Sequence, residues 1–287
     1  MPTLLDGKVT ADALLQRTAA RVDAIKRATG VTPGLATILV GDDPASATYV
    51  RMKGKRCEAV GMASRRVEMP AATTTDELVA QVLALGDDPA IHGILLQHPV
   101  PHHIDERTAF EAIPPEKDVD GVTIASFGAA AFGLLQRPGM GFGSCTPAGI
   151  MTLLAAYDVE FAGLHAVVIG RSPILGKPMA AMLLDASATV TVCHSRTRDL
   201  PGLVRQADLV VAAVGKPAFV RGDWIKPGAI VVDAGYNPGN IGDVDFEPCA
   251  ARAAMITPVP GGVGPMTIAT LIDHTATAAA RQLGVGA

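Results

Sequence analysis

The chain has few aromatic residues, few charges and little excess charge of either sign, and each deficit excludes a class of protein. Aromatic residues make up 4% of the 287 positions, so the cores must consist mainly of Ala, Val, Leu and Ile. Charged residues make up 18% and hydrophobic residues 49%, which excludes an intrinsically disordered chain. The formal net charge is −4 and no basic stripe is present, so we expect no nucleic-acid partner.

Paired cysteines and uninterrupted apolar runs are also missing. None of the 4 cysteines forms a C-x-x-C pair, which favours reduced thiols in a cytoplasmic protein. The uncharged stretches Pro138–Tyr157 and Ala253–Ile272 are long enough to cross a membrane, but proline and glycine interrupt both. Asp6 and Lys8 stand where a signal peptide would have its apolar run. We therefore expect no membrane partner and a cytoplasmic location.

What the chain does contain is an alternation of short apolar runs with helical patterns. Its length favours about two domains. In the first half we expect strands at Gly34–Val40, Arg65–Met69 and Ile91–Leu96, and in the second half at Ala166–Ile169, Thr189–Cys193, Leu209–Val214 and Ile230–Asp233. Strands that alternate with helices predict parallel sheets. The predicted fold is α/β, with two α/β domains flanking a cleft and a Rossmann-like doubly wound sheet in the second.

Helix signals between these runs locate the domain junction. Asp43 and Pro44 predict the start of a helix that Gly61 ends, and Thr74 with Glu77 predicts a capping box. Small residues dominate the stretch 121–143, after which a new helix begins, and a last helix begins near Thr267. We expect one domain at residues 1–143 plus 267–287, because the last helix returns to it, and the other at residues 144–266.

A turn rich in glycine follows the first strand of the second domain, in the sequence HAVVIGRSPILGKPMA. Gly170 permits a tight turn and Gly176 permits close backbone approach, but the spacing is not G-x-G-x-x-G. The next strand ends at Cys193 without the carboxylate typical of NAD sites, whereas Arg171, Ser195 and Arg196 suit a 2′-phosphate. This pattern favours NADP over NAD, although an ordinary β–α turn and a solvated Arg196 remain possible from these residues alone.

The pair Tyr49 and Lys53 is the first candidate for general acid–base chemistry. The two residues lie one helical turn apart on one face, where a phenol beside an ammonium group can relay a proton. An amphipathic helix edge with a long lysine side chain gives the same pattern. In short-chain dehydrogenases a similar pair follows the nucleotide turn, whereas here it precedes Gly170 by more than a hundred residues. That order argues against membership of that class.

Further polar residues follow the expected strand Ile91–Leu96. Gln97 stands at a strand end, where ligands of α/β proteins bind, and Asp120 precedes a glycine; a plain turn and an Asx-turn are the alternatives. His98, His102 and His103 lie close together, but no further ligand completes a metal pattern, so we expect no metal. The stretch Thr257–Thr267 combines glycine and proline in a rigid loop, which suits contact with a flat ligand or a tight connection into the last helix.

Together these stretches resemble the bifunctional methylenetetrahydrofolate dehydrogenase/cyclohydrolase family. The matching segments, in the family's order, are YVRMKGKRCEAVGM, GILLQHPVP, KDVDGV, CTPAGI, VVIGRSPILGKPMA, TVCHSRT, IKPGAIVVDAGYN and TPVPGGVGPMT. The resemblance implies a catalytic domain, an NADP domain and a homodimer. It also implies that NADP⁺ oxidises 5,10-methylenetetrahydrofolate to the methenyl compound, which is then hydrolysed to 10-formyltetrahydrofolate.

The resemblance also implies roles for individual residues. Lys53 is the principal catalytic group, assisted by Tyr49 and Gln97, and Asp120 anchors the pterin ring. The folate substrate is expected to contact Tyr49, Val50, Arg51, Met52, Lys53, Leu96, Gln97, His98, Asp120, Pro260, Gly261, Gly262, Val263 and Gly264. The cofactor is expected to contact Gly170, Arg171, Ser172, Ser195 and Tyr236, to which the strand-end pattern adds Arg196.

The chain departs from the family pattern at His98, Ser126, Ser144, Ala234 and Tyr236. His98 and Tyr236 flank the two expected ligand sites, so substrate affinity or the balance of the two activities is open to change. Three alternatives remain from the sequence: a monofunctional dehydrogenase, a catalytically altered folate-binding paralogue, and a protein similar to shikimate dehydrogenase. The last lacks support because its substrate-binding signatures are not present.

Overall fold

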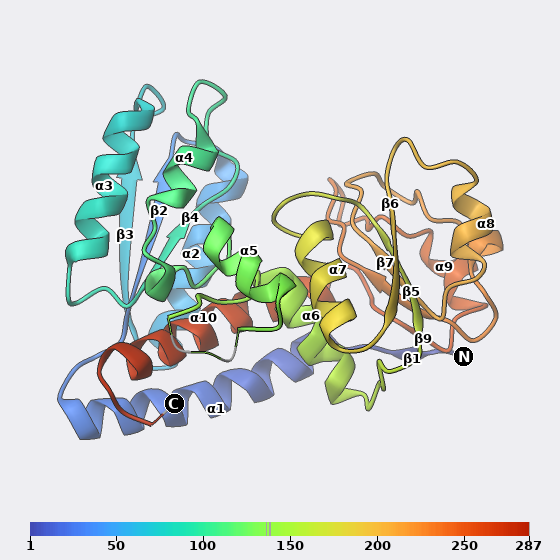
Figure 1. The fold of residues 1–287 in the computed structure, drawn as a ribbon, viewed down its shortest axis with the longest axis horizontal. Helices are drawn as coiled ribbons and strands as arrows, with labels where there is room; N and C mark the ends of the chain where they lie inside the picture. Colours follow the sequence, from blue (N-terminus) through green and yellow to red (C-terminus); the bar gives the residue numbers. More distant parts are fainter. Residues whose placement is uncertain (136, 138, 287) are drawn as a thin grey trace. The chain divides into compact units, whose positions relative to one another are not determined.

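The computed structural model describes residues 1–135, 137 and 139–286, with the backbone alone described at 44–47. These residues form two compact units, each of which contains one parallel sheet (Figure 1). The three-stranded unit comprises residues 13–129, 134–145 and 268–287. The six-stranded unit comprises residues 1–12, 130–133 and 146–267.

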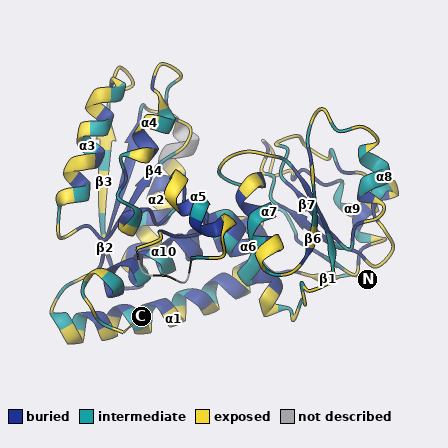
Figure 2. Ribbon diagram, viewed as in Figure 1, coloured by how far each residue is buried: buried dark blue, intermediate teal, exposed yellow. Residues whose placement is uncertain are grey.

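The sheet of the three-stranded unit has β2 (Gly34–Val40) in its centre. β3 (Ala63–Met69) and β4 (Gly93–Leu96) pair with β2 in parallel on either side. Parallel neighbours need crossover connections, and helices α2 (Pro44–Ala59) and α3 (Thr75–Asp87) provide them. All residues of β2 and β4 are buried, whereas β3 alternates toward solvent (Figure 2). The strands predicted in the first half of the chain are confirmed, apart from small differences in their ends.

The start of α3 follows the local rule that the sequence predicts. The Thr74 hydroxyl accepts a hydrogen bond from the Glu77 amide at 3.3 Å, and the Glu77 carboxylate accepts one from the Thr74 amide at 2.8 Å. This reciprocal pair satisfies amides that the first turn of a helix leaves without partners. The predicted capping box is therefore confirmed.

Two long helices complete the core of the three-stranded unit. α1 (Gly7–Thr29) and α10 (Val263–Gln282) contribute Val22 and Ile272 to a cluster that also contains Leu35 and Leu95. Asp273 on α10 accepts hydrogen bonds from two side chains of α1. The unit also contains α4 (Glu106–Glu111), the 3-10 turn η1 (Pro115–Lys117) and most of α5 (Ile124–Ala131).

The second sheet has the strand order β1-β9-β8-β7-β5-β6, and every pair is parallel. Its strands are β1 (Thr3–Leu4), β5 (His165–Ile169), β6 (Thr189–Cys193), β7 (Leu209–Ala212), β8 (Ile230–Asp233) and β9 (Met255–Ile256). Its helical elements are α6 (Cys145–Ala156), α7 (Gly176–Asp185), α8 (Leu200–Val204), η2 (Gly222–Trp224) and α9 (Phe246–Ala250). The chain moves from β5 to β6 on one side and then returns to β7 on the other. The strand order therefore reverses at β5, as in a doubly wound fold.

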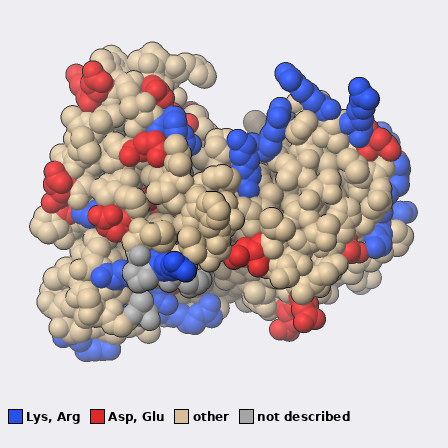
Figure 3. Space-filling model, in the orientation of Figure 1, with Lys and Arg blue, Asp and Glu red and all other residues tan. Residues whose placement is uncertain are grey.

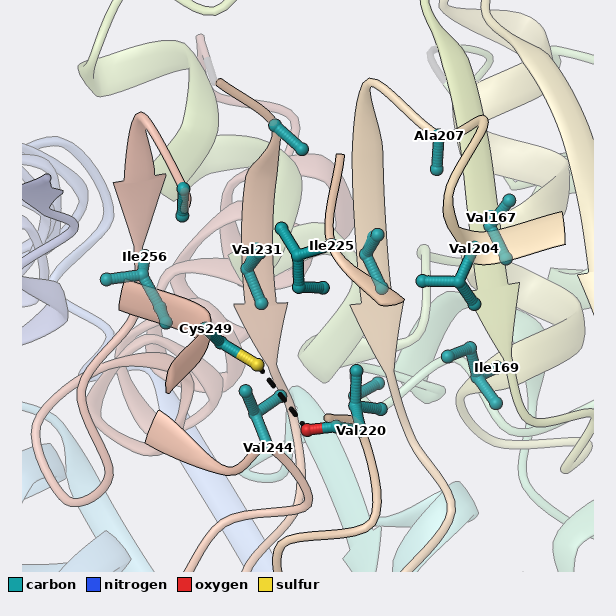
Figure 4. Packing of buried hydrophobic residues seen from close by; sticks show 14 of the residues in the cluster. Val167, Ile169, Val204, Ala207, Val220, Ile225, Val231, Val244, Cys249 and Ile256 are labelled. Carbon is teal, nitrogen blue, oxygen red and sulfur yellow. Dashed lines mark hydrogen bonds between the residues drawn. The ribbon is translucent and has the colours of Figure 1, made fainter. Parts of the chain in front are cut away.

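Valine and isoleucine side chains build the core of this unit, as Figure 4 shows. Val167 and Ile169 extend from β5, Val231 from β8 and Ile256 from β9, and Cys249 on α9 donates a hydrogen bond from its thiol to the Val220 carbonyl at 3.4 Å. Close packing of branched side chains compensates for the shortage of aromatic residues. The predicted α/β class with a Rossmann-like parallel sheet is confirmed.

Two features of the sheet and its helices differ from the sequence-based expectation. β1 joins the sheet beside β9, because the Thr3 and Leu5 amides donate to carbonyls at Ala254 and Ile256. α10 begins at Val263 rather than near Thr267, because Pro265 lies in its first turn, where the missing N–H costs nothing. The domain limits expected at residues 143/144 and 266/267 stay a prediction; part of that junction, residues 136 and 138, lies outside the described residues.

In the described part of the chain, no helix has both the length and the apolar character needed to cross a membrane. All four cysteines, Cys57, Cys145, Cys193 and Cys249, carry free thiols and are buried.

We predict that Lys117→Met destabilises the three-stranded unit. The Lys117 ammonium is buried and donates to the carbonyls of Gly86 and Asp88 at 2.7 and 2.9 Å, so it satisfies the C-terminal end of α3. Loss of these charged hydrogen bonds should lower the free energy of unfolding by about 2 kcal/mol in urea denaturation. Lys55→Met, at an exposed lysine of α2, is the matched control and should change it by less than about 0.5 kcal/mol. Equal effects of the two substitutions would contradict this assignment.

Candidate functional site

The Lys53 amine is the centre of the candidate site in the three-stranded unit. Lys53 lies on α2 with 8% of its surface exposed, and its Nζ donates a hydrogen bond to Gln97 Oε1 at 3.0 Å. Gln97 follows β4, and its amide nitrogen donates to the His98 carbonyl at 2.7 Å, which fixes the orientation of the side chain. The crossover α2 and the strand β4 therefore bring together two residues that lie 44 positions apart in the sequence.

Burial and a nearby carboxylate act in opposite directions on the Lys53 amine. Burial lowers its pKa, because a charged ammonium loses hydration, and the negative charge of Asp120 opposes the shift. Burial likewise raises the pKa of Asp120 from 3.8 to about 6, although the charge of Lys53 opposes that change. The two groups therefore titrate closer to neutrality than they would in water. Such groups are suited to proton transfer.

The segment Lys117–Gly121 holds Asp120 in place. The buried Asp118 carboxylate accepts hydrogen bonds from the Val122 and Thr123 amides at 3.0 and 2.9 Å and from the Ser126 hydroxyl at 2.6 Å. Ser126 is one of the departures from the family pattern, and its hydroxyl supports this turn. A second departure, Ser144, donates to the Gly121 carbonyl at 2.8 Å and ties the turn to the start of α6.

Two further residues beside Asp120 were not predicted as site residues. The buried Cys145 thiol donates to the Val119 carbonyl oxygen at 3.1 Å, and the Cys145 amide donates to the Asp120 carbonyl at 3.2 Å. His274 on α10 lies 2.9 Å from the same Val119 carbonyl through its Nδ1. Cys145 stands in the quoted segment CTPAGI, but nothing in the sequence connects His274 with Asp120. Only the packing of α10 brings it there.

The other residues expected on the folate side lie in different environments. Tyr49 is half-buried one turn before Lys53 on the same face of α2. Val50 and Leu96 are buried core residues, whereas Arg51 and Met52 are exposed. These contacts with substrate stay predictions.

His98, which the resemblance marks as a departure from the family pattern, has its own hydrogen-bond partner. Its Nδ1 lies 2.6 Å from Glu106 Oε1 at the start of α4, and this hydrogen bond raises the pKa of His98. Nε2 of the nearby His103 contacts the Thr73 carbonyl at 2.9 Å. Among the residues that the structure describes, no group of three or more His, Cys, Asp or Glu is placed to hold a metal ion.

The expected loop Pro260–Gly264 belongs to the six-stranded unit and meets the start of α1 there. The Lys8 amide donates to the Gly261 carbonyl at 3.2 Å, and a Cβ at Gly7 would collide with the Gly262 carbonyl oxygen. Lys53, Gln97 and Asp120 are thus brought together within one unit, whereas this loop lies in the other.

The cofactor residues expected from the sequence follow the carboxyl ends of β5 and β6, except Tyr236, which follows β8. Gly170 has φ +138°, and a Cβ there would collide with the Ala213 carbonyl oxygen at the end of β7. A Cβ at Gly176 would collide with the Gly170 carbonyl, so both glycines allow the turn to pack closely where the strand order reverses. The Ser172 hydroxyl accepts from the Leu175 and Gly176 amides at 3.2 and 3.3 Å, at the positive end of α7.

Basic and hydroxyl side chains surround this position. Arg171, Ser195 and Arg196 are exposed, and Lys and Arg side chains project from the upper edge of the six-stranded unit in Figure 3. Tyr236, a further departure from the family pattern, is 59% exposed and donates from its hydroxyl to Asn240 at 2.8 Å. A helix N-terminus with nearby cations fits the phosphates of a dinucleotide.

Comparisons with known proteins agree over both units. A family model described as "Tetrahydrofolate dehydrogenase/cyclohydrolase, catalytic domain" matches residues 5–120, and one described as "Tetrahydrofolate dehydrogenase/cyclohydrolase, NAD(P)-binding domain" matches residues 144–283. The chain is 60% identical over 280 residues to the bifunctional protein FolD of Cellvibrio japonicus, with 98% of each chain covered.

Solved structures give the same result. The bifunctional FolD of Campylobacter jejuni has a TM-score of 0.93 at 45% identity, covering 97% of this chain and 99% of that one. The Trypanosoma brucei enzyme, solved with NADP and an inhibitor, has a TM-score of 0.92 at 40% identity, covering 98% of each chain. Shikimate dehydrogenase from Aquifex aeolicus, at 14% identity and a TM-score of 0.53, shares the fold alone.

We predict that the titration of Asp120 makes stability fall as pH rises. The folded state binds the Asp120 proton more tightly than the unfolded chain, so this contribution is full below a pH of about 4 and is lost as pH rises through about 6. Asp120→Asn should remove up to about 3 kcal/mol of this decline. Urea denaturation of both proteins at intervals from about pH 4 to about pH 7 measures it. Parallel pH profiles would count against the raised pKa.

Proposed function

The chain belongs to the tetrahydrofolate dehydrogenase/cyclohydrolase family, and from this membership we propose that it carries out both reactions of that family. It oxidises 5,10-methylenetetrahydrofolate with NADP⁺ to 5,10-methenyltetrahydrofolate and hydrolyses this product to 10-formyltetrahydrofolate. The observation that carries the proposal is the buried Lys53 amine, which is hydrogen-bonded to Gln97 and lies in the electrostatic field of Asp120.

In the oxidation, the task of the protein is alignment. When bound, NADP⁺ supplies the hydride acceptor. The substrate nitrogens stabilise the cation that develops at the bridging carbon, so no protein base has to remove a proton there. The residues that fit the cofactor are Gly170, Arg171 and Ser172 after β5 and Ser195 and Arg196 after β6, with Tyr236 at the end of β8.

In the hydrolysis, the task is proton transfer. Water adds to the methenyl carbon, Lys53 accepts the proton that this water loses, and the bond from that carbon to N5 then breaks as N5 takes up a proton. One proton is released overall. Gln97 holds the amine in position through its Oε1, and burial lowers the pKa of Lys53, which favours the neutral amine. Above about pH 6 the ionised Asp120 accepts hydrogen bonds from the donor groups of the pterin ring.

We propose that the enzyme works as a homodimer in the cytoplasm. β6 is an edge strand of the six-stranded sheet, its sequence TVTVC has no charge, and Val192 is 40% exposed. Uncharged edges of this kind favour pairing with a second chain.

Four free thiols suit a reducing compartment, where cell fractionation should find the protein. Sedimentation should give twice the 29.5 kDa chain mass.

We predict that Lys53→Met abolishes the cyclohydrolase activity while the protein still folds. Methionine retains most of the length of the side chain but accepts no proton, so hydrolysis of methenyltetrahydrofolate should fall by at least about 100-fold. The absorbance of the methenyl compound follows the reaction, and Lys55→Met is the control. Hydrolysis by the variant at the wild-type rate would remove Lys53 from this role. If the wild-type protein reduces NADP⁺ but does not hydrolyse methenyltetrahydrofolate, it is a monofunctional dehydrogenase. If it catalyses neither reaction, it is a folate-binding paralogue.

We predict that Arg196→Ala weakens the preference for NADP⁺ over NAD⁺. Loss of one charged hydrogen bond to a 2′-phosphate should raise KM for NADP⁺ about tenfold and leave KM for NAD⁺ nearly unchanged. Initial rates with each cofactor measure the effect, and Arg198→Ala, at the exposed arginine two positions on, is the matched control. An equal rise of KM for both cofactors would show that Arg196 does not read the phosphate.

A further inference from the structure

Asp243 holds the turn that follows β7. Its carboxylate is fully buried, and its Oδ2 accepts hydrogen bonds from the Val214 and Gly215 amides at 2.6 and 2.8 Å. Its Oδ1 accepts from the Lys216 amide at 2.9 Å and from Asn237 Nδ2 at 3.1 Å. One side chain therefore binds three consecutive backbone amides of this turn, which fixes the path of residues 214–216.

Asp243 is itself fixed by the core and by a second carboxylate. The buried Asp233, at the end of β8, accepts from the Asp243 and Val244 amides, both at 2.9 Å. The Asp243 carbonyl accepts from the Val220 amide at 2.9 Å, and Val244 is part of the apolar cluster in Figure 4. The position of the Asp243 carboxylate thus follows from the packing of the core, and the turn after β7 follows from the carboxylate.

The turn lies where a doubly wound sheet receives its ligand. β7 is the neighbour of β5 on the side toward which the strand order reverses, and Gly170 packs against the carbonyl of Ala213. Ligands of open parallel sheets bind outside the carboxyl ends of the strands at this reversal. Because Asp243 takes up the amides of residues 214–216, these amides are not donors for phosphate. The phosphates must therefore be bound from the β5–α7 side.

We propose that Asp243 is a positioning residue for the cofactor: it holds the turn 213–216 in the shape that receives the nicotinamide half of NADP⁺, while the phosphates are bound from the β5–α7 side. The inference rests on the proposed dehydrogenase function. The proposed role concerns this half of the cofactor only, because the 2′-phosphate half is expected to bind at Ser195 and Arg196 after β6. Asp243 acts through the backbone of the turn and touches no reacting atom.

Asp243→Asn tests this role, because it turns one carboxylate oxygen into an NH₂ group that faces amide donors. We expect the Kd for NADP⁺, measured by calorimetry, to rise about tenfold or more. The Kd for adenosine 2′,5′-bisphosphate, which lacks the diphosphate and the nicotinamide, should change less than about twofold. Hydrolysis of methenyltetrahydrofolate without NADP⁺ should stay near the wild-type rate, which shows that the three-stranded unit of the variant is folded, and the retained affinity for the bisphosphate shows the same for the six-stranded unit.

Asp208→Asn is the matched control. Asp208 also accepts a backbone hydrogen bond, from the His165 amide at 2.9 Å, but it precedes β7 and so lies at the opposite edge of the same sheet. It should leave both Kd values unchanged. If Asp243→Asn does not fold, Asn237→Ala provides the test, because it removes one partner of the carboxylate and leaves the three amides bound. It should weaken NADP⁺ binding about threefold, again without affecting the bisphosphate.

Two results would overturn the proposal while the wild-type enzyme still reduces NADP⁺. The first is wild-type affinity for NADP⁺ in the folded variant. The second is an equal loss of affinity for NADP⁺ and for the bisphosphate, which would make Asp243 a residue that supports the whole unit. Absence of NADP⁺ reduction by the wild-type enzyme would instead refute the proposed function.

Discussion

Burial of the Lys53 amine is the constraint around which the three-stranded unit is arranged. An ammonium group that loses its hydration is costly unless partners replace the water, and here Gln97 accepts its hydrogen bond while the charge of Asp120 favours its protonated form. The rotation of α2 about its axis must therefore direct Lys53 toward the end of β4, and β4 must end where Gln97 can reach the amine. Burial of the Lys53 ammonium group destabilises the fold, but it also moves the pKa of Lys53 toward the range in which an amine can take up and release a proton.

The charged residues of the segment Lys117–Gly121 have different roles. Lys117 satisfies the carbonyls at the end of α3, and Asp118 binds the amides of the turn that follows. Asp120 is the residue of the segment whose charge acts on Lys53. Two of the three charged residues of the motif thus build the support that holds the third. Ser126 and Ser144, which depart from the family pattern, serve the same turn through hydroxyl groups.

The six-stranded unit uses the same device at a different place. There Asp233 and Asp243 organise the loops at the carboxyl ends of β7 and β8, as Asp118 organises the turn before α5. A buried carboxylate can accept several amide hydrogen bonds at once, which makes it an efficient way to shape a loop that has no regular structure. In both units, buried acidic side chains thus hold the loops around the expected ligand sites through hydrogen bonds to backbone amides.

The sequence by itself determined the α/β class, most strands and the capping box of α3, because these follow from local apolar runs and from the short capping pattern of Thr74 with Glu77. It also indicated Lys53, Gln97 and Asp120 as site residues, through a resemblance carried by several motifs. It did not reveal β1 or β9, since two residues that pair carry no periodic signal. Only the tertiary structure decided that Lys53 is buried against Gln97, that His274 supports the Asp120 turn and that Asp243 shapes the turn after β7. These contacts join positions far apart in the chain, and their energies depend on burial, which no local pattern records.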